Sequence, residues 1–164
     1  MRVRELMSAP VTSIRPSDSL EQAARQLWEH DCGMLPVVDS NGAVGAAITD
    51  RDICMGAYTR GKKLSEMRVR DSMSQEITVC RADEDVARAA EAMRKSKIRR
   101  LPVVDELGKL VGVISLNDIA RAASNDASMG RELVHTMATV CAAQARRVAT
   151  NVKAEPVFSA AHKS

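Results

Sequence analysis

The sequence predicts an α+β fold in which two tandem βαββα units pack sheet to sheet with pseudo-twofold symmetry, followed by a C-terminal amphipathic helix. The first observation behind this prediction is an internal duplication. An offset of 66 residues aligns Val3–Ile53 with Val69–Ile119 without a gap, and 17 of the 51 aligned pairs are identical. The second is the hydrophobic pattern, which passes through strand and helix periods in the same order in both halves.

Each half begins with a short extended segment and a helix. The extended segments are Val11–Ile14 and Ile77–Cys80. Ser17 and Asp83 are the expected N-caps of the helices that follow, because such side chains accept hydrogen bonds from the first free amides of a helix. Both helices have apolar residues at i, i+3, i+4 and i+7, which form one buried stripe. The stripe consists of Leu20, Ala23, Ala24 and Leu27 in the first half and of Val86, Ala89, Ala90 and Met93 in the second.

A β-hairpin and a second helix complete each half. Gly42 and Gly108 occupy the hairpin turns, where a positive φ favours glycine. The second helices are expected to begin after Thr49 and Ser115. A three-stranded sheet with both helices on one face leaves its other face uncovered, and about 60 residues bury too little surface to be stable alone. The two sheets are therefore expected to cover each other. The hairpin strands are Leu35–Val38, Val44–Ile48, Leu101–Val104 and Leu110–Ile114.

These elements predict a domain organisation with two repeats and a C-terminal extension. The extension contains apolar residues at helical spacing, so it is expected to be an amphipathic helix that caps its own module or docks on a second subunit. The predicted ranges are 1–60 for the first repeat, 61–68 for a polar connector, 69–125 for the second repeat, 126–147 for the helix and 148–164 for a flexible tail.

Composition excludes several classes of function. The net charge of the 164-residue chain is only +3, and its aromatic residues are one Trp, one Tyr and one Phe, so neither charge nor stacking residues favour a nucleic-acid partner. No apolar stretch approaches the roughly 20 residues that span a bilayer, so no membrane association is expected. The four Cys and three His lack metal-ligand spacing, which predicts reduced thiols in the cytoplasm. No nucleophile with an adjacent base is present, so we do not expect an enzyme.

Two hydroxyl–carboxylate pairs occupy equivalent positions in the repeats. Thr49 precedes Asp52, and Ser115 precedes Asp118, by three residues. A hydroxyl at the start of a helix with a carboxylate three positions later is also the pattern of a capping box, so a purely structural role explains both pairs. The same geometry offers free amides and a positive helix end to a phosphate, and a carboxylate to the hydroxyls of a ribose. Both interpretations remain open at this point.

A basic run, Arg94–Arg100, precedes the second hairpin. Its first residues suit the C-terminal end of a helix, where cations are favoured. Arg99 and Arg100 instead lead directly into the expected strand. The first repeat has Gly33 and Met34 at these two positions, so any cleft that depends on the arginine pair should differ between the repeats.

The motifs of both halves resemble the CBS domain. The shared pattern is Val-Arg-x-x-Met-Ser at the start, Leu-Pro-Val-Val-Asp in the middle and Gly-x-x-x-Gly-Val-Ile-Ser-x-x-Asp-Ile at the end. The second repeat matches this ending from Gly108 to Ile119. The first repeat departs from it, because Gly45 stands one place early and Ala46 holds the usual glycine position.

The resemblance implies a regulatory module that binds AMP, ADP, ATP or NAD in clefts between the repeats. It implies ribose and phosphate contacts at the hydroxyl–carboxylate pairs, phosphate contacts at the arginines, and adenine contacts along the first extended segments. Arg51 is the nearest charge that the first repeat offers. The implied binding residues are Thr12, Ile14, Thr49, Arg51, Asp52, Thr78, Cys80, Arg99, Arg100, Ser115 and Asp118. It further implies a homodimer formed through the repeat helices. Such a module either acts on a separate protein target or reports ligand by itself. A structural dimerisation module with non-functional clefts is the alternative.

Overall fold

The computed structural model describes residues 1–124, 130, 131, 133–140 and 142, and its elements follow the predicted order. The first repeat contains a 3-10 turn η1 (Val3–Glu5), α1 (Leu20–Glu29), β1 (Leu35–Val38), β2 (Val44–Ile48) and α2 (Asp50–Arg60). The turns η2 (Leu64–Glu66) and η3 (Val69–Asp71) lead into the second. The second repeat contains β3 (Cys80–Arg81), α3 (Val86–Ser96), β4 (Arg100–Val104), β5 (Leu110–Ser115) and α4 (Leu116–Ala123).

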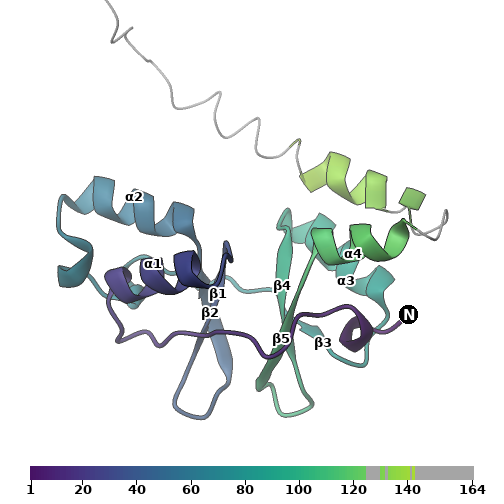
Figure 1. The fold of residues 1–164 in the computed structure, drawn as a ribbon, viewed down its shortest axis with the longest axis horizontal. Helices are drawn as coiled ribbons and strands as arrows, with labels where there is room; N and C mark the ends of the chain where they lie inside the picture. The colour runs from purple at the N-terminus through teal and green to yellow at the C-terminus, as the bar shows by residue number, and fades with distance from the viewer. Residues whose placement is uncertain (125–129, 132, 141, 143–164) are drawn as a thin grey trace, which may run out of the picture.

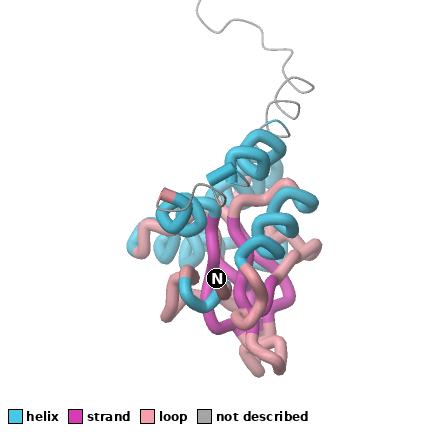
Figure 2. The backbone as a smooth tube through the Cα atoms, turned by 90° about the vertical axis from the view of Figure 1, so that its right-hand side faces the viewer, coloured by secondary structure: helices cyan, strands magenta, loops and turns pink. Residues whose placement is uncertain are grey.

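The strands pair antiparallel within each hairpin, β1 with β2 and β4 with β5, and the two hairpins lie beside each other in the middle of the molecule (Figure 1). Ala43 and Lys109 pair between the hairpin turns, and the amide of Leu110 donates to the carbonyl of Gly42 at 3.1 Å. The helix pairs α1/α2 and α3/α4 lie at opposite ends of this arrangement, and Figure 2 shows the strands between helices. The predicted α+β fold with two facing repeats is therefore confirmed.

The first strand of each repeat is shorter than predicted. In the first repeat it is reduced to one parallel bridge between Ile14 and Val37, so β1 and β2 form a two-stranded sheet. In the second repeat only Cys80–Arg81 joins β4, which completes a three-stranded sheet. The preceding residues leave the sheet, and Thr12 instead borders a cleft between the repeats.

The helix N-caps lie two residues later than predicted. Ser19, not Ser17, caps α1: its hydroxyl accepts from the amide of Gln22 at 3.1 Å, and the Gln22 side chain accepts from the amide of Ser19 at 2.8 Å. Asp85, not Asp83, caps α3 by accepting from the amide of Ala87 at 2.9 Å. A Gln three residues after Ser19 is the reciprocal partner of a capping box, and this signal decides the first helix boundary.

The repeats exchange their leading segments. Val3 is fully buried in the apolar cluster of the second repeat, and its amide donates to the carbonyl of Glu84 at 2.9 Å. Met67 and Val69 are buried in the cluster of the first repeat, where the amide of Val69 donates to the carbonyl of Asp18 at 2.8 Å. In Figure 1 the N-terminal segment starts beside β3 and passes across the strands of the hairpins, above their turns, to reach α1. Each core is therefore completed by residues that belong in sequence to the other half.

A close backbone approach holds the N-terminal crossing in place. Ser8 pairs with Val113, and a Cβ at Gly112 would lie 2.6 Å from the Met7 sulfur and 3.0 Å from the Ser8 carbonyl oxygen. A side chain at position 112 would therefore require Met7 and the crossing segment to shift. In the first repeat the equivalent position is Ala46, which is also buried, and the neighbouring Ala47 pairs with Ser74.

The C-terminal extension is described only in part. Residues 130, 131, 133–140 and 142 are helical, and Leu133 and Val140 are buried against the cluster of the second repeat. The other residues of the predicted helix 126–147, and the predicted tail 148–164, lie outside the described residues. Within the described part, no helix combines the length and apolarity needed to cross a membrane.

Candidate functional site

A cleft of about 670 Å³ lies between the repeats and takes side chains from both. The crossing segment contributes Thr12, and the end of the α1–β1 connection contributes Met34. The second repeat contributes Arg100 from β4, Ser115 from the end of β5 and Asp118 from the first turn of α4. Four of the predicted binding residues, Thr12, Arg100, Ser115 and Asp118, therefore border one space.

The carboxylate of Asp118 is held rigidly at this cleft. Its Oδ2 accepts from the amide of Ser115 at 2.8 Å and from the Ser115 hydroxyl at 2.6 Å. The same hydroxyl accepts from the amide of Asp118 at 3.3 Å, so the pair forms the capping box of α4. The other oxygen, Oδ1, accepts from Nη2 of Arg121. The Asp118 side chain is only 8% exposed, whereas that of Arg121 is 77% exposed.

The pair in the first repeat has the same cap and a different neighbour. Asp52 Oδ2 accepts from the amide of Thr49 at 2.9 Å and from its hydroxyl at 2.7 Å. The position that corresponds to Arg121 is Met55, so this carboxylate has no arginine on its own helix at that spacing. No ion pair of Asp52 is present in the part of the chain that the structure describes.

The two arginines predicted to act together are separated by the structure. Arg100 borders the cleft, and a Cβ on Gly33 would lie 3.1 Å from both of its terminal nitrogens, so glycine at position 33 leaves room for the guanidinium. Arg99 is exposed and is not among the residues that line the cleft. Arg99 lies in the bend before β4, whereas Arg100 is the first residue of that strand. Met34, the counterpart of Arg100 in the first repeat, borders the same cleft as Arg100. The two positions therefore do not define separate clefts.

Two predicted adenine contacts are core residues. Ile14 and Cys80 are 2% and 3% exposed and belong to the apolar clusters of their repeats. Burial raises the pKa of Cys80 to about 12, which keeps its thiol protonated. Cys32 borders the cleft, and burial also raises its pKa, while Arg100 opposes this effect. Neither thiol has the lowered pKa of a nucleophile.

The remaining predicted residues lie elsewhere. The hydroxyl of Thr78 hydrogen-bonds that of Ser96 at 2.8 Å, at the end of α3. Arg51 is exposed at the start of α2, next to the Thr49 cap. By the repeat symmetry, Thr49, Asp52 and Thr78 are the counterparts of Ser115, Asp118 and Thr12.

Sequence reasoning missed Arg121, although a signal was present. It follows Asp118 by three residues, which is the spacing of an ion pair on one helical face. His30 and Asp31 at the end of α1 also border the cleft and were not predicted. No local pattern identifies them, because they reach the site only through contact between the repeats.

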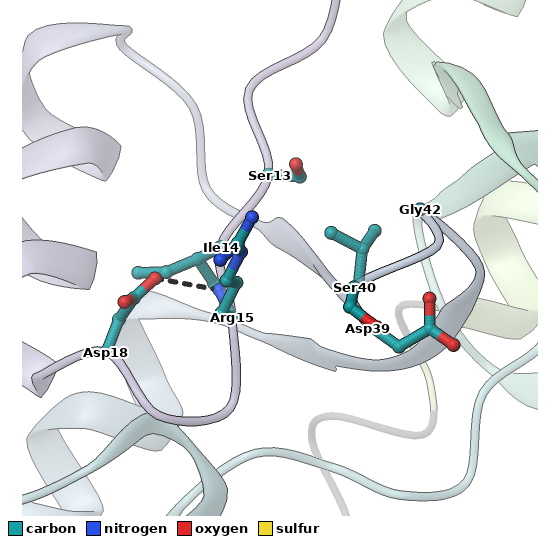
Figure 3. Close-up of a pocket in the computed structure, with 8 residues that line it drawn as sticks. Ser13, Ile14, Arg15, Asp18, Asp39, Ser40 and Gly42 are labelled. Atoms are coloured by element: carbon teal, nitrogen blue, oxygen red, sulfur yellow. Dashed lines mark hydrogen bonds between the residues drawn. The ribbon is translucent and has the colours of Figure 1, made fainter.

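A smaller hollow of about 430 Å³ lies beside the turn of the first hairpin. Figure 3 shows Arg15 and Asp18 on one side of it and Asp39 and Ser40 on the other, with the amide of Arg15 donating to Asp18 at 2.9 Å. Of the predicted binding residues it contains only the buried Ile14. The described residues also include no group of three or more His, Cys, Asp or Glu that could hold a metal ion.

Comparison with known proteins identifies the repeats. The family model of the CBS domain matches residues 3–56 and 69–125. The CBS domain-containing protein YhcV of Bacillus subtilis is 30% identical over 133 residues, which are 81% of this chain and 93% of that protein. An uncharacterised protein of Methanopyrus kandleri is 32% identical over 71% of this chain and 60% of its own length. A homoserine O-acetyltransferase of Methanococcoides burtonii is 34% identical, but the match covers only 23% of that enzyme, so the similarity concerns a shared domain.

Solved structures agree with this assignment. The CBS domain pair of protein MJ0100, in complex with 5′-methylthioadenosine and S-adenosyl-L-methionine, matches 76% of this chain and 97% of its own with a TM-score of 0.67 and 30% identity. CBSX2 in complex with AMP matches 76% of this chain and 96% of its own with a TM-score of 0.66 and 30% identity. This chain belongs to the CBS domain family and contains a tandem pair of its repeats.

Proposed function

We propose that this chain is a regulatory module that binds an adenosine-containing ligand in the cleft between its two repeats. The observation that carries the proposal is the convergence of Thr12, Arg100, Ser115 and Asp118, which are distant in sequence, on one cleft. The complexes of similar CBS pairs with AMP, 5′-methylthioadenosine and S-adenosyl-L-methionine support the ligand class. AMP is the first ligand to test, and ADP, ATP and NAD belong to the same proposal.

The chemistry of the cleft matches the parts of such a ligand. A carboxylate accepts hydrogen bonds from both hydroxyls of a ribose, and Asp118 is held in place for this by Ser115. A guanidinium donates two parallel hydrogen bonds to a phosphate, which is the role proposed for Arg100. The N-terminal end of α4 adds a favourable field for an anion. Thr12 lies on the opposite repeat, so a bound ligand would contact both halves and stabilise their present arrangement.

A thermal-denaturation panel tests this proposal. A ligand that binds only the folded state raises the unfolding free energy by RT ln(1 + [L]/Kd), which is about 2.7 kcal/mol at a hundred times Kd. We expect AMP or adenosine to raise the melting temperature clearly, and ribose 5-phosphate to do so much less because it lacks the base. The panel includes ADP, ATP, NAD and S-adenosylmethionine. No shift with any adenosine compound at millimolar concentration would contradict the proposal.

A second proposal is a homodimer formed through the helices of the first repeat. Trp28 on α1 and Tyr58 on α2 are 87% and 83% exposed, which is unusual for aromatic residues in a chain that has so few. Trp28 also borders a mainly apolar hollow of about 370 Å³ with Leu27 and Cys54. A second copy of the chain is the proposed occupant, because exposed aromatic side chains and an apolar hollow are typical of protein interfaces.

Light scattering tests the dimer. We expect a mass of twice 17.8 kDa for the parent chain and a shift toward 17.8 kDa for Trp28→Glu, because a buried charge at an interface is costly. Arg25→Glu, on the same helix, is the control. A parent that stays at 17.8 kDa over a wide concentration range would rule the dimer out. A dimer that binds no adenosine compound would instead favour the structural dimerisation module.

The proposal also includes a separate protein target and a cytoplasmic location. The regulatory character of CBS pairs supports the first, and the free thiols support the second.

A further inference from the structure

Arg121 distinguishes the two otherwise equivalent hydroxyl–carboxylate pairs of the repeats. Ser115 and Asp118 have the same spacing as Thr49 and Asp52, and each pair forms a capping box at the start of its helix. Three residues further along the helix, the second repeat has Arg121 and the first has Met55. The guanidinium of Arg121 is hydrogen-bonded to Oδ1 of Asp118 and borders the cleft.

This ion pair occupies the atom that a ribose would use. Asp118 Oδ2 already accepts two hydrogen bonds from Ser115, which account for its two lone pairs. Oδ1 is therefore the oxygen left for ligand hydroxyls, and it is the one that Arg121 contacts. Because the Arg121 side chain is 77% exposed, the ion pair is screened by water and can be displaced. A ribose that binds Asp118 must compete with this guanidinium.

We propose that Arg121 makes the Asp118 cleft selective for adenosine ligands that have an anionic group at the 5′ position. The inference rests on the proposed function and names the ligand class of that same site. When ribose hydroxyls take Oδ1, the displaced guanidinium is left beside the ligand without its anion. A 5′-phosphate supplies a new anion for it, whereas adenosine and 5′-methylthioadenosine do not. Arg100, in the same cleft, adds to this preference but does not compete for Asp118.

The first repeat provides the internal comparison. Asp52 faces no competing arginine on its helix, and Met55 at that position is an uncharged thioether, 47% exposed. A ligand that uses Asp52 displaces no cation and gains none from this position. Binding at Asp52 should therefore discriminate less between AMP and adenosine than binding in the cleft at Asp118.

The test measures AMP and adenosine affinities by calorimetry for Arg121→Met. The substitution places in the second repeat the residue that the first already has. It is made in an Asp52→Ala background, so that one cleft is observed. We expect AMP to bind about 10- to 100-fold more weakly, as for the loss of one charge-assisted hydrogen bond. Adenosine should bind equally or more tightly, because its competitor is gone. The AMP-to-adenosine affinity ratio should therefore fall by about tenfold or more.

Three further variants make the result decisive. Arg88→Met removes the same charge from an exposed position on α3, outside the cleft, and should leave the ratio unchanged. Arg121→Lys retains the charge without the planar fork and should give an intermediate ratio. Met55→Arg, in an Asp118→Ala background, should raise the ratio for any binding at Asp52. Circular dichroism and the melting temperature without ligand verify that each variant is folded.

The outcomes separate the inference from the function on which it rests. A parent chain that binds neither AMP nor adenosine overturns the proposed function, and the inference with it. A parent that binds AMP while Arg121→Met and Arg121→Lys both leave the ratio unchanged overturns the inference alone. Weaker AMP binding with adenosine binding unchanged or tighter supports it, because a merely structural arginine would weaken both.

Discussion

Replacing Asp118 by alanine is expected to weaken AMP binding by about 10- to 100-fold while the protein remains folded. The buried carboxylate is the proposed acceptor of the ribose hydroxyls, and a hydrogen bond to a charged group contributes about 1.5–3 kcal/mol. Adenosine should lose at least as much, since it has no phosphate to contact the arginine released from Asp118. The structural cost is that of a helix cap, about 1 kcal/mol. Isothermal titration of both ligands measures the loss.

Two control variants separate binding from capping. Asp105→Ala removes a carboxylate that accepts two backbone hydrogen bonds, from Leu107 and Lys109 at 2.9 Å each, but that lies in the hairpin turn outside the cleft. It should cost stability and leave affinity unchanged. Asp52→Ala should leave binding in the cleft at Asp118 unchanged. If Asp118→Ala and Asp52→Ala both bind AMP as the parent does, these carboxylates serve only as helix caps.

The largest expected loss of stability comes from Leu101→Ala and its counterpart Leu35→Ala. Both leucines are fully buried, one in the cluster of each repeat. Truncating a buried leucine removes apolar contact and leaves a cavity, at a cost of about 2–5 kcal/mol. This is a large part of the roughly 5–15 kcal/mol by which domains are stable. Urea denaturation followed by circular dichroism measures both variants.

Both substitutions should shift one common unfolding transition. Val3 is buried in the core of the second repeat and Val69 in that of the first, so neither repeat keeps its core intact when the other unfolds. Leu107→Ala, at a 78% exposed turn position, is the matched control and should change the unfolding free energy by no more than about 0.5 kcal/mol. Two separate transitions, with each variant moving only one, would contradict this coupling.

The sequence alone determined the repeat, the order of elements and the class of the fold. These features are local, because each hairpin, turn or apolar helix face is formed by residues that lie close together in the sequence. The capping boxes at Thr49 and Ser115 were also visible, because each is a contact over three residues. The cap at Ser19 differs from the predicted Ser17, although its partner Gln22 also lies only three residues away.

Only the tertiary structure decided which residues share the site and which complete each core. It placed Thr12 with Asp118, separated Arg100 from Arg99, and buried Ile14 and Cys80. It also placed Val3 in the core of the second repeat and Val69 in the core of the first. These outcomes depend on how two similar sheets meet, and a pattern repeated in both halves is equally compatible with each half closing on itself. The contacts between the repeats remove that ambiguity, because each leading segment pairs and packs with the opposite half.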